Sequence, residues 1–177
     1  MPIKIYKPVG ITPFELVKKF KKENNISQKV SFAGRLDPMA HGEMLLLVGD
    51  ECKKQDTYCG RNKIYEFDIL YGITTDTLDI LGISSKNPKP ENNNIEKLMG
   101  KYEQSYPLYS SKTIGNKKKE PLWKLAQSGL SNDLIPKKMV DIMELEKLGE
   151  YSFDNKELLT MILNKISLLS DDYKERF

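Results

Sequence analysis

The sequence has few of the residues that bind metals or form disulfides. Its 177 residues include two cysteines, Cys52 and Cys59, and one histidine, His41. Neither the number nor the spacing of these side chains fits a zinc site, and a structural disulfide is not expected. We therefore predict two ordinary thiols in a reducing compartment and no metal site.

Long apolar segments are also missing. No run of about 18 apolar residues is present for a membrane span, and the opening MPIKIYKPVG reaches proline and glycine too early for a signal peptide. Hydrophobic residues make up 39% of the chain and charged residues 30%, as in soluble globular proteins. At the usual ~100–200 residues per domain, we expect one cytoplasmic domain over residues 1–177, without membrane contact.

Charge of one sign is only slightly in excess. The formal net charge of +3 permits nucleic-acid binding without establishing it. The lysines gather in three runs, which are Lys18, Lys19, Lys21 and Lys22, then Lys117, Lys118 and Lys119, then Lys137 and Lys138. Such runs are more often solvated surfaces than phosphate contacts, so the charge pattern alone assigns no function.

The beginning of the chain predicts a strand followed by a helix. The apolar residues in 3–6 indicate a short strand, which the turn residues 7–10 end. Thr12 and Glu15 fit the capping box of a helix that starts at the next position. We expect the apolar stripe of this helix to consist of Phe14, Val17 and Phe20.

Two further strands are expected in the middle of the sequence. Residues 31–42 lack a period and predict a loop, whereas the apolar run at 43–49 predicts a strand in the middle of a sheet. Residues 63–71 alternate between apolar and polar side chains, which predicts another strand. Its apolar face would consist of Tyr65, Phe67, Ile69 and Tyr71.

The rest of the chain predicts short elements. In order, they are a loop at 72–82, a polar connector at 84–94, a short helix after residue 94, a second helix at 121–128, a strand at 138–149 and an amphipathic helix at 155–169. A strand is the alternative for the last segment.

A carboxylate with a neighbouring arginine lies in the loop between the predicted strands. This loop reads GRLDPMAHG, with Arg35 two residues before Asp37. An aspartate in a turn usually only caps the turn through its side chain. The spacing alone therefore favours a structural role for Asp37.

Five ordered blocks across residues 7–149 resemble the motifs of TruB-type pseudouridine synthases. They are KPVGITPFELV, GRLDPMAHG followed by LLLVGDECKK, NKIYEF, GITTDTLDILG, and QSYPLYSSKTIGNKKKEPLWKLAQSG. Each block alone is a weak signal, but their shared order makes chance resemblance improbable. The resemblance implies an α+β pseudouridine synthase fold, with a central, mostly antiparallel mixed sheet flanked by helices and a cleft for RNA.

The resemblance also implies an activity, the isomerisation of uridine to pseudouridine in RNA, with the T-loop of tRNA as the expected substrate. The family's catalytic aspartate corresponds to Asp37 and its active-site tyrosine to Tyr65. A uridine inside folded RNA must be flipped out, at a cost of about a few kcal/mol, and Tyr65 would stack on it. Asp37 would act in its ionised form as nucleophile or base, without a cofactor.

An ionised carboxylate in a dry pocket needs a cationic partner. TruB enzymes take this partner from a late block in which an arginine follows a tyrosine and an apolar residue. Here the corresponding stretch is DYKERF, which offers Lys174 or Arg176 without a basis for choosing. Arg35, in place of a small residue, is a further candidate partner, with a phosphate contact and a structural role as alternatives.

Two more departures from the TruB pattern lie near the aspartate. Phe32 replaces a histidine, and His41 replaces a threonine. We interpret His41 as a structural loop residue. The family's C-terminal RNA-binding extension, often a PUA domain, has no counterpart in this sequence.

We also predict which residues bind RNA. The candidates are Asp76, Tyr109, Lys112, Lys117, Lys118 and Lys119. We expect the lysine-rich loop at 112–119 to clamp phosphate in the cleft beside Asp37 and Tyr65, and the protein to act on RNA as a monomer.

Two other functions remain open at this point. The first is a non-catalytic RNA-binding or RNA-folding protein with a degenerate synthase fold. The second is a subunit directed by guide RNA, as in the dyskerin branch. The small size and the missing PUA region argue against the second function.

Overall fold

The computed structural model describes residues 1–86, 95–110, 112–115 and 120–171. The chain divides into two compact units, one formed by Met1–Glu66 with Phe153–Phe177 and the other by Phe67–Ser152. Within the described ranges, no helix has the length and apolar character that crossing a membrane requires.

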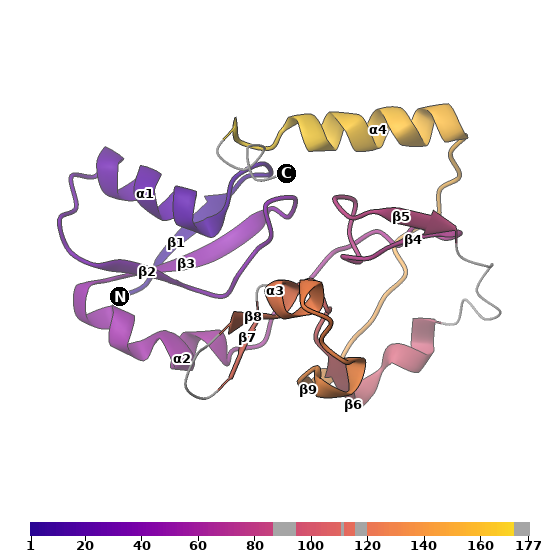
Figure 1. The fold of residues 1–177 in the computed structure, drawn as a ribbon. Coiled ribbons are helices and arrows are strands. Elements are labelled where there is room, and N and C mark those ends of the chain that lie inside the picture. Colours follow the sequence, from indigo (N-terminus) through magenta and orange to yellow (C-terminus); the bar gives the residue numbers. More distant parts are fainter. Residues whose placement is uncertain (87–94, 111, 116–119, 172–177) are drawn as a thin grey trace. The chain divides into compact units, whose positions relative to one another are not determined.

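The first unit is built on a three-stranded antiparallel sheet (Figure 1). Its strands are β1 (Ile3–Lys7), β2 (Val30–Ala33) and β3 (Gly42–Val48), in the order β1-β3-β2. The apolar run of β3 thus occupies the middle position, as predicted, and Met44, Leu46 and Leu47 are buried. The expected loop at 31–42 is wrong at its start, because its first three residues continue β2.

Helix α1 (Pro13–Glu23) packs on this sheet and begins at the predicted capping box. The Thr12 side chain accepts the Glu15 N–H at 3.1 Å, and a Glu15 carboxylate oxygen accepts the Thr12 N–H at 2.6 Å. The predicted stripe is only partly right, since Leu16 and Val17 are buried while Phe14 is 61% exposed. Helical spacing allows both choices, and contact with β2 selects Leu16.

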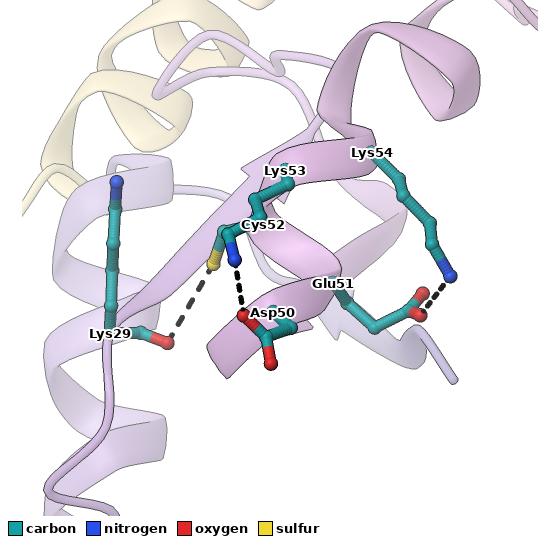
Figure 2. Close-up of polar contacts among 6 residues, drawn as sticks. All are labelled: Lys29, Asp50, Glu51, Cys52, Lys53 and Lys54. Atoms are coloured by element: carbon teal, nitrogen blue, oxygen red, sulfur yellow. Dashed lines mark hydrogen bonds and ion pairs between the residues drawn. The ribbon is translucent and has the colours of Figure 1, made fainter.

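A 3₁₀ helix, η1 (Gly49–Lys54), and helix α2 (Gln55–Cys59) follow β3 and contact β2. Residues three apart lie above one another in a 3₁₀ helix. Figure 2 shows the two ion pairs that result, Asp50 with Lys53 at 2.7 Å and Glu51 with Lys54 at 2.8 Å. The Cys52 thiol donates to the Lys29 carbonyl at 3.7 Å, so η1 is also bonded to the segment before β2.

The last helix returns to the first unit. Helix α4 (Asn155–Ser167) confirms the helix predicted at 155–169 and begins with a second capping box, formed by Asp154 and Glu157. Just beyond its end, the Ser170 N–H donates to the Gly10 carbonyl at 2.8 Å, and Leu169 is only 5% exposed. The C-terminal end of α4 is therefore docked against the turn that follows β1.

The described residues of the second unit form three two-stranded antiparallel sheets, one α-helix and two 3₁₀ helices. Its elements are β4 (Ile73–Thr75), β5 (Ser84–Lys86), η2 (Ile95–Leu98), β6 (Gly100–Ser105), β7 (Thr113–Ile114), β8 (Glu120–Pro121), α3 (Leu122–Gln127), η3 (Asn132–Leu134) and β9 (Lys137–Ile142). The pairs are β4 with β5, β6 with β9, and β7 with β8. Leu122 of α3 is fully buried.

Several predictions for this unit need correction. The helix at 121–128 is confirmed, the strand at 138–149 ends at Ile142, and the helix after residue 94 is a single 3₁₀ turn followed by β6. The connector begins with β5, and its residues 87–94 lie outside the described ranges. The described strands form four separate sheets instead of the expected central sheet.

The strand predicted at 63–71 is wrong for the structure as described. These residues are irregular and exposed, with Tyr65 at 65% and Phe67 at 60%. Alternation tells which side chains would share a face, but a strand also needs a neighbour for its N–H and C=O groups. None of the described strands pairs with this segment.

Gly10 provides a test of how the first unit is held together. Its φ is +96°, and an added Cβ would collide with the Leu168 carbonyl oxygen. We expect Gly10→Ala to lower the free energy of unfolding by about 2–4 kcal/mol. Chemical denaturation monitored by circular dichroism would measure the loss.

Gly34→Ala is the matched control for this variant. Gly34 has a φ of +84°, but an added Cβ would meet nothing within 4 Å. The free energy of unfolding of this variant should fall only by the cost of backbone strain, about 1–2 kcal/mol. Equal losses in the two variants would show that the α4 end does not pack on Gly10.

Candidate active site around Asp37

The candidate site is the loop that joins β2 to β3, residues 34–41. Gly34 opens the loop with a φ of +84°. The Ala40 N–H then donates to the Asp37 carbonyl at 3.0 Å, which closes a tight turn. The Asp37 side chain is exposed at this turn, where a substrate can reach it.

Three contacts fix this loop to the rest of the first unit. At its start, the Gly34 N–H donates to the Cys59 sulfur at 3.4 Å. In its middle, the Gly10 N–H donates to the Pro38 carbonyl at 2.8 Å. At its end, the His41 Nδ1 lies 2.7 Å from the Tyr6 hydroxyl. The aspartate is therefore carried by a loop bonded to α2, to the turn after β1, and to β1 itself.

A buried lysine lies within electrostatic range of this aspartate. Lys7, at the end of β1, has no exposed surface, and its Nζ donates to the carbonyls of Pro8 at 2.7 Å and Ile11 at 2.8 Å. Burial lowers the pKa of the Lys7 ammonium, while the negative charges of Asp37 and Glu15 oppose this effect. A positive charge here favours the ionised form of a nearby carboxylate.

Our sequence analysis did not assign a role to Lys7. The signal was present in the alternation of β1, because Ile3, Ile5 and Lys7 lie on the same face of a strand. A lysine that continues an apolar face points toward the core. A buried ammonium needs bonded acceptors and nearby negative charge, so this position also points toward acidic side chains in the vicinity.

Glu15 extends the polar cluster to the end of the chain's last helix. One of its carboxylate oxygens accepts the Thr12 N–H at 2.6 Å, and the other accepts the Ser170 hydroxyl at 2.6 Å. Its charge opposes the burial effect on the pKa of Lys7. The cluster therefore joins β1, α1 and the segment after α4.

The other predicted catalytic residues are less closely tied to Asp37. Arg35 lies exposed in the same loop. Tyr65 belongs to the same unit, but no hydrogen bond joins it to Asp37 within the described ranges, and its side chain is 65% exposed. Lys174 and Arg176 lie outside the described residues. The roles of these four residues stay predictions.

The predicted RNA-binding residues belong to the second unit. Tyr109 is 39% exposed, and the Lys112 Nζ lies 4.9 Å from the ring centre of Tyr106. Lys117, Lys118 and Lys119 lie outside the described ranges. The described residues contain no group of three or more His, Cys, Asp or Glu side chains that could hold a metal ion.

Asp76 has a structural task that the sequence analysis did not assign. Its carboxylate accepts the Ile83 N–H at 2.8 Å, and the carboxylate of Asp79 accepts the Leu81 N–H at 2.9 Å. A Cβ on Gly82 would collide with Thr77 and lie 2.5 Å from an Asp76 carboxylate oxygen. The TDT-x-D-x-x-G block thus forms a self-bonded turn between β4 and β5.

The lowered pKa of Lys7 makes a prediction about stability and pH. Because the pKa is lower in the folded than in the unfolded protein, the unfolded state binds more protons in the range just below the ordinary value of 10.5. The free energy of unfolding of the wild type, relative to that of Lys7→Met, should therefore rise as the pH approaches 10.5. Urea denaturation of both proteins from pH 7 upward measures this difference.

Lys4→Met serves as the control for removing a lysine from the same strand. Lys4 is exposed and pairs with Glu43 at 2.8 Å. The assignment of a lowered pKa to Lys7 would be contradicted by a stability difference between the wild type and Lys7→Met that does not change with pH. An equally large pH-dependent difference for Lys4→Met would contradict it as well.

Comparison with known proteins places these residues in a family. A family model described as TruB family pseudouridylate synthase (N terminal domain) matches residues 19–164. A protein named tRNA pseudouridine synthase B from Caldicellulosiruptor saccharolyticus is 35% identical over 149 residues, which are 81% of this chain and 50% of that protein.

Two other proteins of the same name agree with this match. The one from Endomicrobium trichonymphae is 35% identical over 150 residues, covering 81% of this chain and 63% of its own length. The one from Bacillus subtilis is 32% identical over 150 residues, covering 80% of this chain and 47% of its own length. The chain thus spans about half the length of the curated relatives it matches. With a family match over more than half of its residues, the chain belongs to the TruB family of pseudouridylate synthases.

Proposed function

We propose that this protein is an RNA pseudouridine synthase, an isomerase that converts uridine to pseudouridine in the T-loop of tRNA. The observation that carries the proposal is the position of Asp37 at the aspartate of the family motif, on a loop fixed at three points and close to the buried Lys7 charge. The names of the relatives, which specify tRNA, support this substrate class.

The proposed reaction needs a base that has left its stack and a carboxylate that is ionised. The flipped uridine presents its sugar and base to Asp37, which acts as nucleophile or base. The bond between N1 and C1′ breaks, the uracil rotates, and a bond forms between C5 and C1′. The proton on C5 is released and N1 takes one up, so no cofactor is consumed.

The residues of this chain favour the ionised carboxylate in two ways. Lys7 supplies a positive charge from the protein side, where water is excluded. We propose that a second cation, Arg35, Lys174 or Arg176, pairs with Asp37 from the substrate side. The bonds from Pro38 to Gly10 and from Gly10 to Ser170 support the two late candidates, since they tie the described end of the chain to the Asp37 loop.

We propose RNA-binding residues in each unit. Tyr65 is exposed and available to stack on the flipped base. Tyr109 and Lys112 would contact the RNA together with Lys117, Lys118, Lys119 and Asp76. We further propose one catalytic domain that works in a reducing, cytoplasmic setting as a monomer and without guide RNA.

Tritium release from tRNA labelled at uridine C5 tests the proposed activity. The wild type should release tritium in proportion to the pseudouridine formed. Asp37→Ala should lower the rate at least about a thousandfold, because it removes the reacting carboxylate. Asp50→Ala, which removes an exposed carboxylate from η1, is the matched control and should release tritium like the wild type. RNA binding by a wild type that releases no tritium would instead indicate a non-catalytic RNA-binding protein.

The cationic partner of Asp37 can be identified among the three candidates by single substitutions. Replacing the true partner, in Arg35→Gln, Lys174→Gln or Arg176→Gln, should lower kcat by about a hundredfold through lost stabilisation of the carboxylate. Its RNA dissociation constant should stay near that of the wild type. If a substitution weakens RNA binding without lowering kcat, the replaced residue contacts phosphate. If none of the three substitutions lowers kcat, the proposed pairing with Asp37 is contradicted.

A further inference from the structure

An exposed pair of side chains lies beside the Asp37 loop, and the proposed reaction does not use it. The Tyr6 hydroxyl and the His41 Nδ1 are 2.7 Å apart, and the ring centres are 6.0 Å apart at an angle of 46°. Tyr6 is 57% exposed, and His41 is exposed as well. Neighbouring residues of a strand point to opposite faces, so Tyr6 faces away from the buried Lys7.

The main chain places this pair close to the proposed nucleophile. His41 is the last residue of the loop and directly follows the turn that Asp37 and Ala40 close. Tyr6 is held opposite Glu43 by the pairing of β1 with β3. The imidazole is therefore anchored to the sheet by Tyr6, and a site supported by strands is more precise than one on a free loop.

The hydrogen bond orients the histidine more than it stabilises the fold. Water can replace either partner of an exposed hydrogen bond, so the net gain in stability is small. The 2.7 Å contact fits the tautomer in which the Tyr6 hydroxyl donates to Nδ1, and in that tautomer the ring proton lies on Nε2. The Nε2–H is then a donor held in one direction.

Two acidic residues, Asp37 and Glu43, lie near His41 in the chain. Glu43 lies opposite Tyr6 in the sheet, and its carboxylate is paired with Lys4 at 2.8 Å. Asp37 is exposed in the same loop and is the residue proposed to engage the uridine. An RNA strand whose base is flipped toward Asp37 has phosphates on both sides of that nucleotide, and backbone contacts of this kind position a nucleic acid.

We propose that His41, oriented by Tyr6, donates through Nε2 to a phosphate oxygen of the RNA strand next to the uridine that Asp37 engages. This proposal rests on the proposed function for the identity of the ligand. His41 is then an RNA-binding residue, and Tyr6 is a positioning residue that acts through it. His41 departs from the TruB pattern, which has threonine at this position.

Three variants of the full chain test the proposal by tRNA binding and by tritium release. His41→Ala should raise the RNA dissociation constant about tenfold, as expected for losing a bond to a charged group. His41→Gln should stay within about threefold of the wild type, because its amide both accepts from Tyr6 and donates to phosphate. Tyr6→Phe should fall between the two. In His41→Ala and Tyr6→Phe the RNA dissociation constant should change more than kcat, because the Gly10 and Cys59 contacts still hold the Asp37 loop when the Tyr6–His41 contact is lost.

Tyr58→Phe is the matched control. It also removes a tyrosine hydroxyl from the first unit, one that donates to Glu51 at 2.9 Å, and it should leave RNA binding unchanged. Thermal unfolding of His41→Ala within about 2 °C of the wild type would show that folding is intact.

The outcomes separate this proposal from the proposed function. RNA binding by His41→Ala equal to the wild type, or by His41→Gln as weak as His41→Ala, would overturn the role of His41. A drop in kcat at unchanged RNA affinity would overturn it as well. If the wild type binds tRNA without releasing tritium, the synthase activity is rejected while the binding series still decides the role of His41. A wild type that binds no RNA rejects both.

Discussion

The two main-chain hydrogen bonds of Gly10 are the constraint on which the arrangement around Asp37 depends. Its N–H donates to Pro38 in the Asp37 loop, and its carbonyl accepts from Ser170 after α4. A φ of +96° and contact with the Leu168 backbone leave room for glycine alone. The middle of the Asp37 loop is therefore held by backbone groups, which a change of side chain elsewhere leaves in place.

The buried ammonium of Lys7 lies beside the hydrogen bonds of Gly10. Lys7 loses its hydration in the folded protein, and the carbonyls of Pro8 and Ile11 replace only part of it. The negative charges of Asp37 and Glu15 reduce the remaining free-energy cost of burying the ammonium. Burial of the Lys7 ammonium thus costs folding free energy, and the two nearby carboxylates offset part of this cost.

The sequence predicted best what depends on neighbouring residues. The capping box of Glu15 and the buried strand at 43–49 are local signals, and both are confirmed. The segment 63–71 failed because its pattern says nothing about whether a partner strand is present. The motif resemblance predicts Asp37 as the reacting residue, but the contact of His41 with Tyr6 depends on the register of β1 with β3, which the sequence pattern does not give.

The docking of α4 also determines when the site can form. Ser170 bonds to Glu15 across a separation of 155 residues, so the first unit is discontinuous along the chain. During synthesis, β1, α1 and the Asp37 loop leave the ribosome well before their last contact exists. Closing so long a loop is entropically costly, and contacts of this range slow folding. The contacts around the Asp37 loop are therefore complete only after translation has passed Ser170, and a nascent chain carries the motif before it carries the folded loop.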